Sequence, residues 1–477
     1  MNRLLILTTN FPPSKSIGTQ RILRICKFLD RNRWKISVLT LKEKYYPEYN
    51  GDDSLPEFMQ DVSVTRTGKL DVVHHLLNVR ENIKKTDSGE DSAAEKPQKT
   101  ANPVANGKAN GAVANGVSLQ DIGYKPAEKL AKRSKWQVLK DFFTDILQFP
   151  DKNMTWLPLA IWRGFWLIKK QKIDVIFSSS PPHSLHLMSA ILKKLTGARL
   201  VIDFRDPWAR SPWHDEERDA NSFEKWKHDK IVAFERWVVR QADQVVLITQ
   251  EMYNDYVAHY SDLPKSKFRL FNNGFDPENL IQFDGSEAET PRTRDKIRFI
   301  HAGSLYKHRD PSPILLAVKN LVDNEIIDRS KVEFIFLGAV TDHQKHTKAL
   351  SEDLGLADVV SFISKVSYQK SLEYMANSDV LILLQPVTKL QLPGKFYDYI
   401  CWDKPILAIA EEGSATKNVV VDRFGVFANF NEIEDIEKGI VFLFDNPDYL
   451  VESIRENRQF FNMANAIKTF DNILESR

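Results

Sequence analysis

Short apolar runs rich in β-branched residues recur along this chain, and stretches with helical periodicity lie between them. In the first part of the chain the runs lie at 4–9, 36–41, 62–67, 174–180, 199–204 and 244–249. After a polar stretch around 277–295 the pattern restarts, with runs at 297–303, 332–338, 359–364, 379–384, 405–410 and 425–430. Strand-like runs that alternate with helices predict parallel β/α units. We therefore expect an α/β fold with two Rossmann-like, doubly wound domains that face each other across a cleft.

The length of 477 residues also favours two domains, because single hydrophobic cores rarely grow beyond ~250–300 residues. The polar stretch places the boundary near residue 285, between an N-terminal domain of residues 1–285 and a C-terminal domain of residues 286–455. Residues 456–477 carry apolar side chains at close to helical spacing, which predicts a closing helix that packs back on the body. Residues 86–118 are rich in Ala, Asn, Gly and Lys and predict a disordered insertion, with a linker role favoured over a binding role.

Composition argues against several classes of partner. The formal net charge of +2 gives no general case for nucleic-acid binding. The two cysteines, Cys26 and Cys401, lie far apart in the sequence and indicate neither a disulfide framework nor a metal cluster, so a reducing cytosol fits best. The N-terminal apolar run is shorter than the ~7–15 residues of a secretion-signal core, and no run reaches the ~18 residues of a membrane span.

Two segments, 129–149 and 155–172, combine Lys and Arg with Trp and Phe at helical spacing. Such helices either pack in the core with the Lys ends reaching solvent, or lie on an anionic membrane surface. Both interpretations stay open, with core packing slightly favoured. Membrane contact would then be peripheral, at the cytoplasmic face.

The first predicted strand runs directly into a Pro-Pro loop and a helix. Gly18 permits a tight turn there, and Thr19 can cap a helix that begins at Gln20. A strand, a flexible loop and a helix N-terminus form a corner that tolerates phosphate, and we place it on the acceptor side of the site. An ordinary β/α turn is the alternative.

Five motifs, in this order, resemble those of glycosyltransferase family 4, whose members have the GT-B fold. They are FPP with its Gly loop, FSSSPPHSLHLMSAILKKLTGARLVIDFRDPW, FNNGFD, HAGSLYKHRDP and LPGKFYDYICWDKPILA. They are spread over nearly the whole chain outside the insertion. The resemblance implies a nucleotide-sugar donor held mainly by the C-terminal domain and an acceptor held by the N-terminal domain. It also implies transfer with retention at the anomeric carbon and no bound metal or other cofactor.

The segment IDFRDPW emerges from a buried strand at the edge where open α/β sheets bind ligands. Asp206 can accept a proton from an acceptor hydroxyl or stabilise positive charge at the anomeric carbon, and Arg205 can hold a phosphate. An Asp–Arg pair that fixes the loop is the alternative, and the pattern does not choose between Asp203 and Asp206. His183, in a Pro-Pro-His loop, is a further candidate for contact with the acceptor, although a structural role is favoured for a single histidine in a loop.

The segment HAGSLYKHRD also follows a predicted strand. Gly303 allows a ligand to approach the backbone closely, and Lys307 and Arg309 lie just beyond it. Either cation suits the charge that develops on a departing nucleoside diphosphate, and no Asp-x-Asp metal motif was found in the chain. Solvated surface charge is the alternative.

The segment LPGKFYD predicts a helix that starts near Lys395, after Gly394. Its free backbone amides would be directed at the diphosphate. In the resembling family a Glu pair lies here, and its second Glu binds the donor ribose. Asp398 occupies the position of the second Glu, whereas Leu390 occupies that of the first.

We therefore expect a metal-independent glycosyltransferase that uses a nucleotide sugar. Its acceptor would be a glycan or lipid-linked saccharide in cell-surface polysaccharide biosynthesis, and no nucleic-acid partner is expected. Two alternatives remain: a nucleotide-sugar epimerase or hydrolase, and a catalytically silent scaffold of the same fold, which Leu390 makes conceivable.

Overall fold

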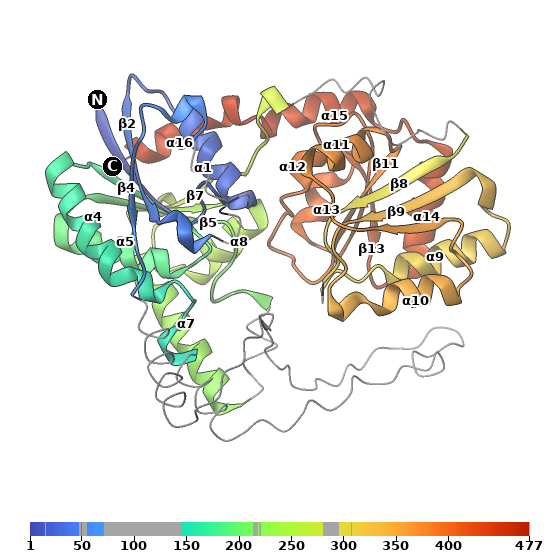
Figure 1. Cartoon of the computed structure of the whole chain (residues 1–477), viewed down its shortest axis with the longest axis horizontal. Helices are drawn as coiled ribbons and strands as arrows, with labels where there is room; N and C mark the ends of the chain where they lie inside the picture. The colour runs from blue at the N-terminus through green and yellow to red at the C-terminus, as the bar shows by residue number, and fades with distance from the viewer. Residues whose placement is uncertain are drawn as a thin grey trace, which may run out of the picture.

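The computed structural model describes residues 1–14, 16–46, 49, 55–70, 145–212, 218, 221–279, 295–306 and 308–476. The insertion expected at 86–118, the boundary expected near residue 285 and Lys307 lie outside the described residues. Within them the chain forms two parallel sheets, each covered by helices on both faces, that lie side by side (Figure 1). The expected pair of doubly wound sheets is confirmed.

The first sheet has seven parallel strands in the order β3-β2-β1-β4-β5-β6-β7. Their bounds are β1 Asn2–Leu7, β2 Trp34–Leu41, β3 Ser63–Thr67, β4 Val175–Ser180, β5 Arg199–Phe204, β6 Gln244–Leu247 and β7 Phe268–Leu270. The covering helices are α1 Ile17–Phe28, α4 Leu157–Gln171, α5 Ser184–Thr196, α7 Ser222–Gln241, α8 Gln250–His259 and α16 Met463–Glu475. Strand order reverses between β1 and β4, and in open α/β sheets the carboxyl ends at such a point form a ligand crevice.

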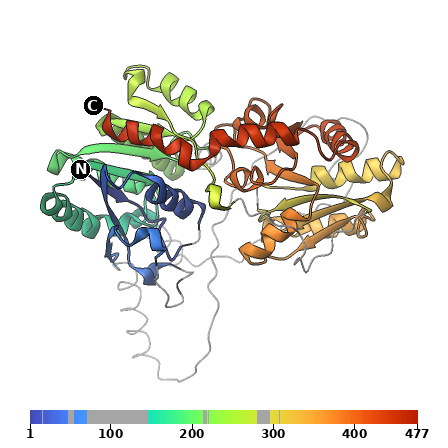
Figure 2. The same ribbon diagram turned by 90° about the horizontal axis from the view of Figure 1, so that it is seen from above.

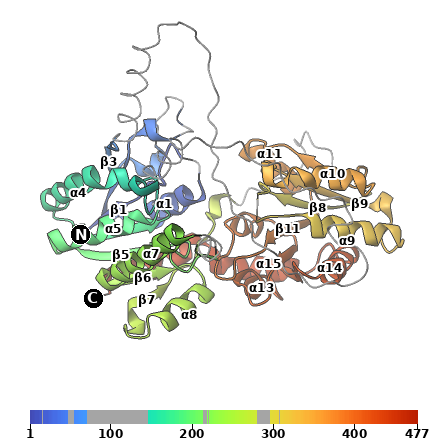
Figure 3. The same cartoon turned by 90° about the horizontal axis from the view of Figure 1, so that it is seen from below.

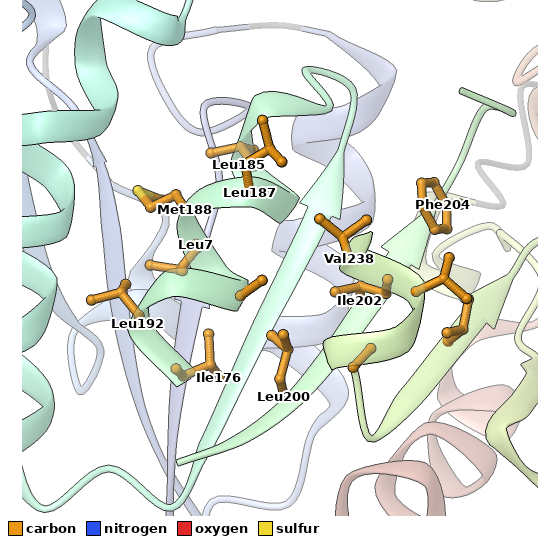
Figure 4. Packing of buried hydrophobic residues seen from close by; sticks show 14 of the residues in the cluster. Leu7, Ile176, Leu185, Leu187, Met188, Leu192, Leu200, Ile202, Phe204 and Val238 are labelled. Carbon is orange, nitrogen blue, oxygen red and sulfur yellow. The ribbon is translucent and has the colours of Figure 1, made fainter. Parts of the chain in front are cut away.

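Apolar side chains on both faces of the first sheet explain why it is covered twice. Helices α4, α5, α7 and α8 share one buried cluster with the sheet, and α1 and α16 share the other. Figure 4 shows how Leu185 and Met188 of α5 and Val238 of α7 pack onto Ile176 and Ile202 of the central strands. The central strand β4 is buried along its whole length, as expected of a strand in a parallel sheet with helices on both faces.

The second sheet has six parallel strands in the order β10-β9-β8-β11-β12-β13. Their bounds are β8 Ile297–Ala302, β9 Val332–Leu337, β10 Val360–Ile363, β11 Val380–Gln385, β12 Ile406–Ala410 and β13 Gly425–Asn429. Helices α9 Ser312–Asp323, α10 His346–Asp353 and α14 Ile433–Asp445 pack on one face. Helices α11 Tyr368–Ala376, α12 Phe396–Tyr399, α13 Ala415–Val420 and α15 Val451–Asn457 cover the other.

The last helix, α16, returns from the second sheet to the first, so that both chain ends lie at the N-terminal domain (Figure 2). The ring of Phe470 is fully buried, and its centroid lies 4.9 Å from those of both Phe177 and Phe271. The next residue on the same helix, Asp471, accepts a 2.5 Å hydrogen bond from Trp34 Nε1 and pairs with Arg33. The N-terminal core is therefore completed by the end of the chain.

Replacing Phe470 with Ala should lower the free energy of unfolding of the N-terminal domain by ~3–5 kcal/mol, because a buried ring leaves a cavity. Phe460→Ala is the control, since that ring is 64% exposed and its loss should change the value by less than ~0.5 kcal/mol. Urea unfolding followed by circular dichroism measures both. Equal effects of the two substitutions would contradict the packing of α16.

Candidate active site

A cavity of about 450 Å³ lies between the two domains. From the N-terminal domain it is lined by His183, Asp206, Pro207 and Ser211. From the C-terminal domain it is lined by Tyr306, Arg309, Gln385, Thr388, Gln391, Leu392, Pro393 and Gly394. These residues follow the carboxyl ends of β4 and β5 in one sheet and of β8 and β11 in the other. Both sheets thus present their ligand-binding edges to one space, which we call the cleft.

A second cavity, of about 210 Å³, lies within the C-terminal domain, and we call it the donor pocket. Its lining includes three of the residues expected at a donor site, Gly303, Lys395 and Asp398. A Cβ atom on Gly303 would overlap Lys395 Nζ, so this glycine lets the ammonium group lie directly on the backbone. The carboxylate of Asp398 lies beside it and is half-buried; burial raises the pKa of Asp398, while Arg24 and Lys395 oppose that shift.

Two cations lie at the junction of the cleft and the donor pocket. Burial, together with the nearby Arg309 guanidinium, lowers the pKa of Lys395 to about 8. Arg309 donates from Nη2 to Gln385 Oε1 at 3.0 Å, and its buried Nε has no hydrogen-bond partner among the described residues. Two like charges held close together favour an anion between them.

The helix expected near Lys395 is a single turn, α12. The amides of Phe396 and Tyr397 donate to the carbonyls of Pro393 and Gly394, at 2.9 and 3.2 Å. These amides are therefore used within the turn, and the expectation that free helix amides would point at a phosphate is wrong for them. The charge that this segment offers is the Lys395 ammonium group.

Asp203 does not line the cleft. It is fully buried, and both of its oxygens are bound by Arg21 of α1, Oδ1 by Nη2 at 2.7 Å and Oδ2 by Nε at 2.9 Å. Ser179 Oγ donates to the same carboxylate at 2.7 Å. Arg21 also donates to the carbonyls of Phe271 and Asn272. Asp203 therefore holds α1, β4, β5 and the chain after β7 together.

Arg205 is turned toward the loop after β4. Its Nε donates to the carbonyl of Ser180 at 2.7 Å and its Nη2 to that of Pro181 at 3.0 Å. A Cβ atom on Gly18 would overlap the guanidinium, so Gly18 is needed where α1 begins. The N-cap of that helix is Ser16, whose side chain accepts from the amide of Thr19, and the expectation that Thr19 caps a helix starting at Gln20 is wrong.

Asp206 lines the cleft, and its Oδ1 accepts a hydrogen bond from Gln391 Nε2 of the other domain. Burial raises the pKa of Asp206, while Arg205 and Gln391 oppose this shift. His183 also lines the cleft, and its ring stacks on Trp208 with centroids 5.1 Å apart. The structure thus brings Asp206, His183 and Arg309 together and leaves Asp203 in the interior.

Sequence reasoning missed Glu235, which fixes the loop that carries Asp206. Its buried carboxylate accepts from the amide of Ala209 at 2.8 Å and from the hydroxyls of Tyr256 and Tyr260, each at 2.9 Å. Burial raises its pKa, and these hydrogen bonds oppose the shift. The signal was present in the sequence, because Glu235 lies four residues after Ile231 and three before Val238, on the buried face of α7.

Both halves of the chain match models of known protein families. Residues 123–279 match the family model described as "Glycosyltransferase Family 4", and residues 283–460 match "Glycosyl transferases group 1". A search of curated protein sequences found no significant match.

Solved structures resemble the whole chain. Sucrose-phosphate synthase from Thermosynechococcus elongatus aligns with a TM-score of 0.62 at 10% identity, over 99% of this chain and 98% of its own. HepE of Anabaena, in complex with UDP and glucose, aligns with a TM-score of 0.59 at 13% identity, over 100% of both chains. WaaG, a glycosyltransferase of lipopolysaccharide biosynthesis, gives 0.54 at 12% identity, over 99% of this chain and 100% of its own. These likenesses confirm the GT-B fold.

Asp203→Asn should lower the free energy of unfolding by ~3–5 kcal/mol, because it leaves the buried Arg21 guanidinium without its counter-charge. Asp206→Asn should leave stability unchanged or raise it. The pKa of Asp206 is raised on folding, so folding disfavours its ionised form at neutral pH, and a neutral amide removes that cost. Denaturant unfolding compares the two, and a larger loss for Asp206→Asn would contradict the distinction.

Proposed function

Because this chain belongs to glycosyltransferase family 4, we propose that it transfers a sugar from a nucleoside-diphosphate sugar to a hydroxyl group of a glycan or lipid-linked saccharide. The observation that carries the proposal is the pair of cations, Arg309 and Lys395, between the cleft and the donor pocket. HepE was solved with UDP and glucose and with UDP-glucose, which supports a donor of this class. WaaG and the galactosyltransferase WaaB belong to lipopolysaccharide assembly, which supports cell-surface polysaccharide biosynthesis.

In the proposed complex the donor spans both cavities. The nucleoside occupies the donor pocket, where Asp398 accepts hydrogen bonds from the ribose hydroxyls. The diphosphate lies between Lys395 and Arg309, next to the backbone of Gly303 and Gly394. The sugar then projects into the cleft.

The reaction breaks the bond between the anomeric carbon and the β-phosphate oxygen, and the electron pair leaves with the phosphate. Lys395 and Arg309 stabilise the negative charge that develops there, so a metal ion is not needed. The acceptor oxygen bonds to the anomeric carbon on the same face, which gives the retention implied by the family resemblance. Its proton passes to Asp206 or to the departing phosphate.

The N-terminal side of the cleft would bind the acceptor. Asp206 acts either as a base for the acceptor hydroxyl or as a negative charge next to the anomeric carbon, and both roles require its ionised form. His183 lies on Trp208 at the same edge and would contact the acceptor sugar. The start of α1 and the loop after β4 lie next to this side of the cleft. They would be held in place by Arg205, Gly18 and Thr19.

Lys395→Met should weaken binding of the nucleotide sugar ~10- to 100-fold, the value of one charge-assisted hydrogen bond. In the unaltered protein the affinity should also fall several-fold as pH rises from neutral through about 8, because Lys395 then loses its proton. Calorimetry with the UDP-, GDP-, ADP- or dTDP-sugar that raises the melting temperature measures both effects.

Lys438→Met is the control, since that side chain is 73% exposed on α14. It should change neither the affinity nor its pH dependence. A pH dependence that persists in Lys395→Met would show that another group binds the diphosphate. Turnover that EDTA abolishes and manganese restores would contradict the metal-independent reaction.

Helix α4 presents two exposed Trp side chains, Trp162 and Trp166, which are 62% and 54% exposed. Arg163, Lys169 and Lys170 are exposed on the same helix, and Figure 3 shows α4 on the side of the N-terminal domain away from the second domain. No helix among the described residues is long and apolar enough to cross a bilayer. We propose that α4 contacts the cytoplasmic surface of an anionic membrane, where a lipid-linked acceptor would be found.

Replacing both Trp162 and Trp166 with Ala should reduce binding to phosphatidylglycerol vesicles roughly ten-fold, because the interfacial aromatic area is lost. Cosedimentation measures it, and Phe460→Ala, which removes an exposed ring of the other domain, is the control. Unchanged vesicle binding would rule out this surface.

A further inference from the structure

One loop of the C-terminal domain reaches into the N-terminal domain. It comprises residues 386–393 between β11 and the turn that carries Lys395, and we call it the bridging loop. Its first half is fixed in its own domain, because Thr388 Oγ1 accepts from Gln385 Nε2 and the carbonyl of Lys389 accepts from the amide of Ala415 at 2.8 Å. At its end, the carbonyl of Pro393 accepts from the amide of Phe396 at 2.9 Å. Val387 has a φ of 75°, a strained conformation for a β-branched residue. Such strain persists only where the surroundings hold it, and it often marks functional loops.

The middle of the bridging loop contacts the other domain through two successive residues. Leu390 packs its side chain against the buried cluster of the N-terminal domain, and its carbonyl accepts from Thr249 Oγ1 at 2.6 Å. Gln391 then donates from Nε2 to Oδ1 of Asp206. The residue at the position of the family's first Glu is thus apolar because it docks on the N-terminal domain.

We propose that Gln391 is a positioning residue for Asp206, and that Leu390 docks the bridging loop so that the Asp206 carboxylate is fixed in rotation only when the two domains meet. This inference rests on the proposed function for the role of Asp206 in the reaction. The contact itself is independent of it.

The side-chain amide of Gln391 is well suited to positioning the Asp206 carboxylate. A carboxylate that accepts one hydrogen bond at Oδ1 is fixed in rotation, which leaves Oδ2 for the acceptor or the anomeric carbon. The charged and titratable groups around Asp206 are Arg205 and Asp203 on its own strand end, His183 after β4 and Arg309 across the cleft. Gln391 adds a donor without adding charge, so it stabilises the ionised form and leaves the charge balance of the cleft unchanged.

The test compares Gln391→Leu with Lys389→Met, which alters a 59% exposed side chain of the same loop. Two readouts are needed. The first is the pKa of Asp206, followed by ¹³C NMR of Asp-labelled protein and assigned with Asp206→Asn. The second is kcat and KM for release of UDP from UDP-glucose, with a bacterial glycolipid extract as acceptor.

In Gln391→Leu the Asp206 pKa should rise, and the acidic limb of the kcat profile should move to higher pH by the same amount. We expect kcat to fall ~10- to 30-fold, the effect of one hydrogen bond to a charged group, with KM for UDP-glucose within two-fold. Leu390→Ala should lower kcat in the same direction, because it loosens the loop. Lys389→Met should change neither readout.

An unchanged Asp206 pKa and an unchanged kcat in Gln391→Leu would overturn the inference. A shifted pKa in a protein that turns over no nucleotide sugar would support the contact between Gln391 and Asp206 and overturn the proposed function instead. A fall in kcat with neither pKa nor pH profile moved would assign Gln391 a merely structural role, and would also overturn the inference.

Discussion

The buried ion pair between Arg21 and Asp203 is the interaction on which the N-terminal side of the site depends. Taking two charges out of water is costly, and the cost is offset here because Ser179 and the carbonyls after β7 complete the hydrogen bonding. The pair fixes α1, β4 and β5 relative to the chain that leaves for the second domain. Asp206, three residues after Asp203, therefore leaves β5 in a fixed direction.

Charge is divided between the two domains in a way that suits glycosyl transfer. The C-terminal domain supplies cations, Arg309 and Lys395, where a leaving group would depart, and the N-terminal domain supplies a carboxylate, Asp206, on the opposite wall of the cleft. Burial shifts the pKa of both Lys395 and Asp206 toward the neutral form. Such groups are preorganised by the fold, and they interact strongly with charge that develops during a reaction.

Much of this arrangement could be predicted from the sequence, because strands buried on both faces leave continuous apolar runs and their carboxyl ends gather ligand-binding residues. The choice between Asp203 and Asp206 could not, since both follow one strand and only the position of Arg21, far away in sequence, separates them. The capping role of Ser16 and the single turn of α12 depend on local hydrogen bonds that residue types leave open. The role of Gln391 could not be predicted from the sequence, because its hydrogen-bond partner, Asp206, belongs to the other domain.

The position of α16 has a consequence for how the protein is made. Synthesis on the ribosome delivers the N-terminal strands first, yet the face of the sheet that carries Phe177 is covered only in part, by α1, until α16 emerges. A growing chain must therefore keep an apolar sheet surface open while the entire second domain is translated and folds. A chain that lacks α16 would keep an exposed apolar surface of the kind that chaperones and proteases recognise.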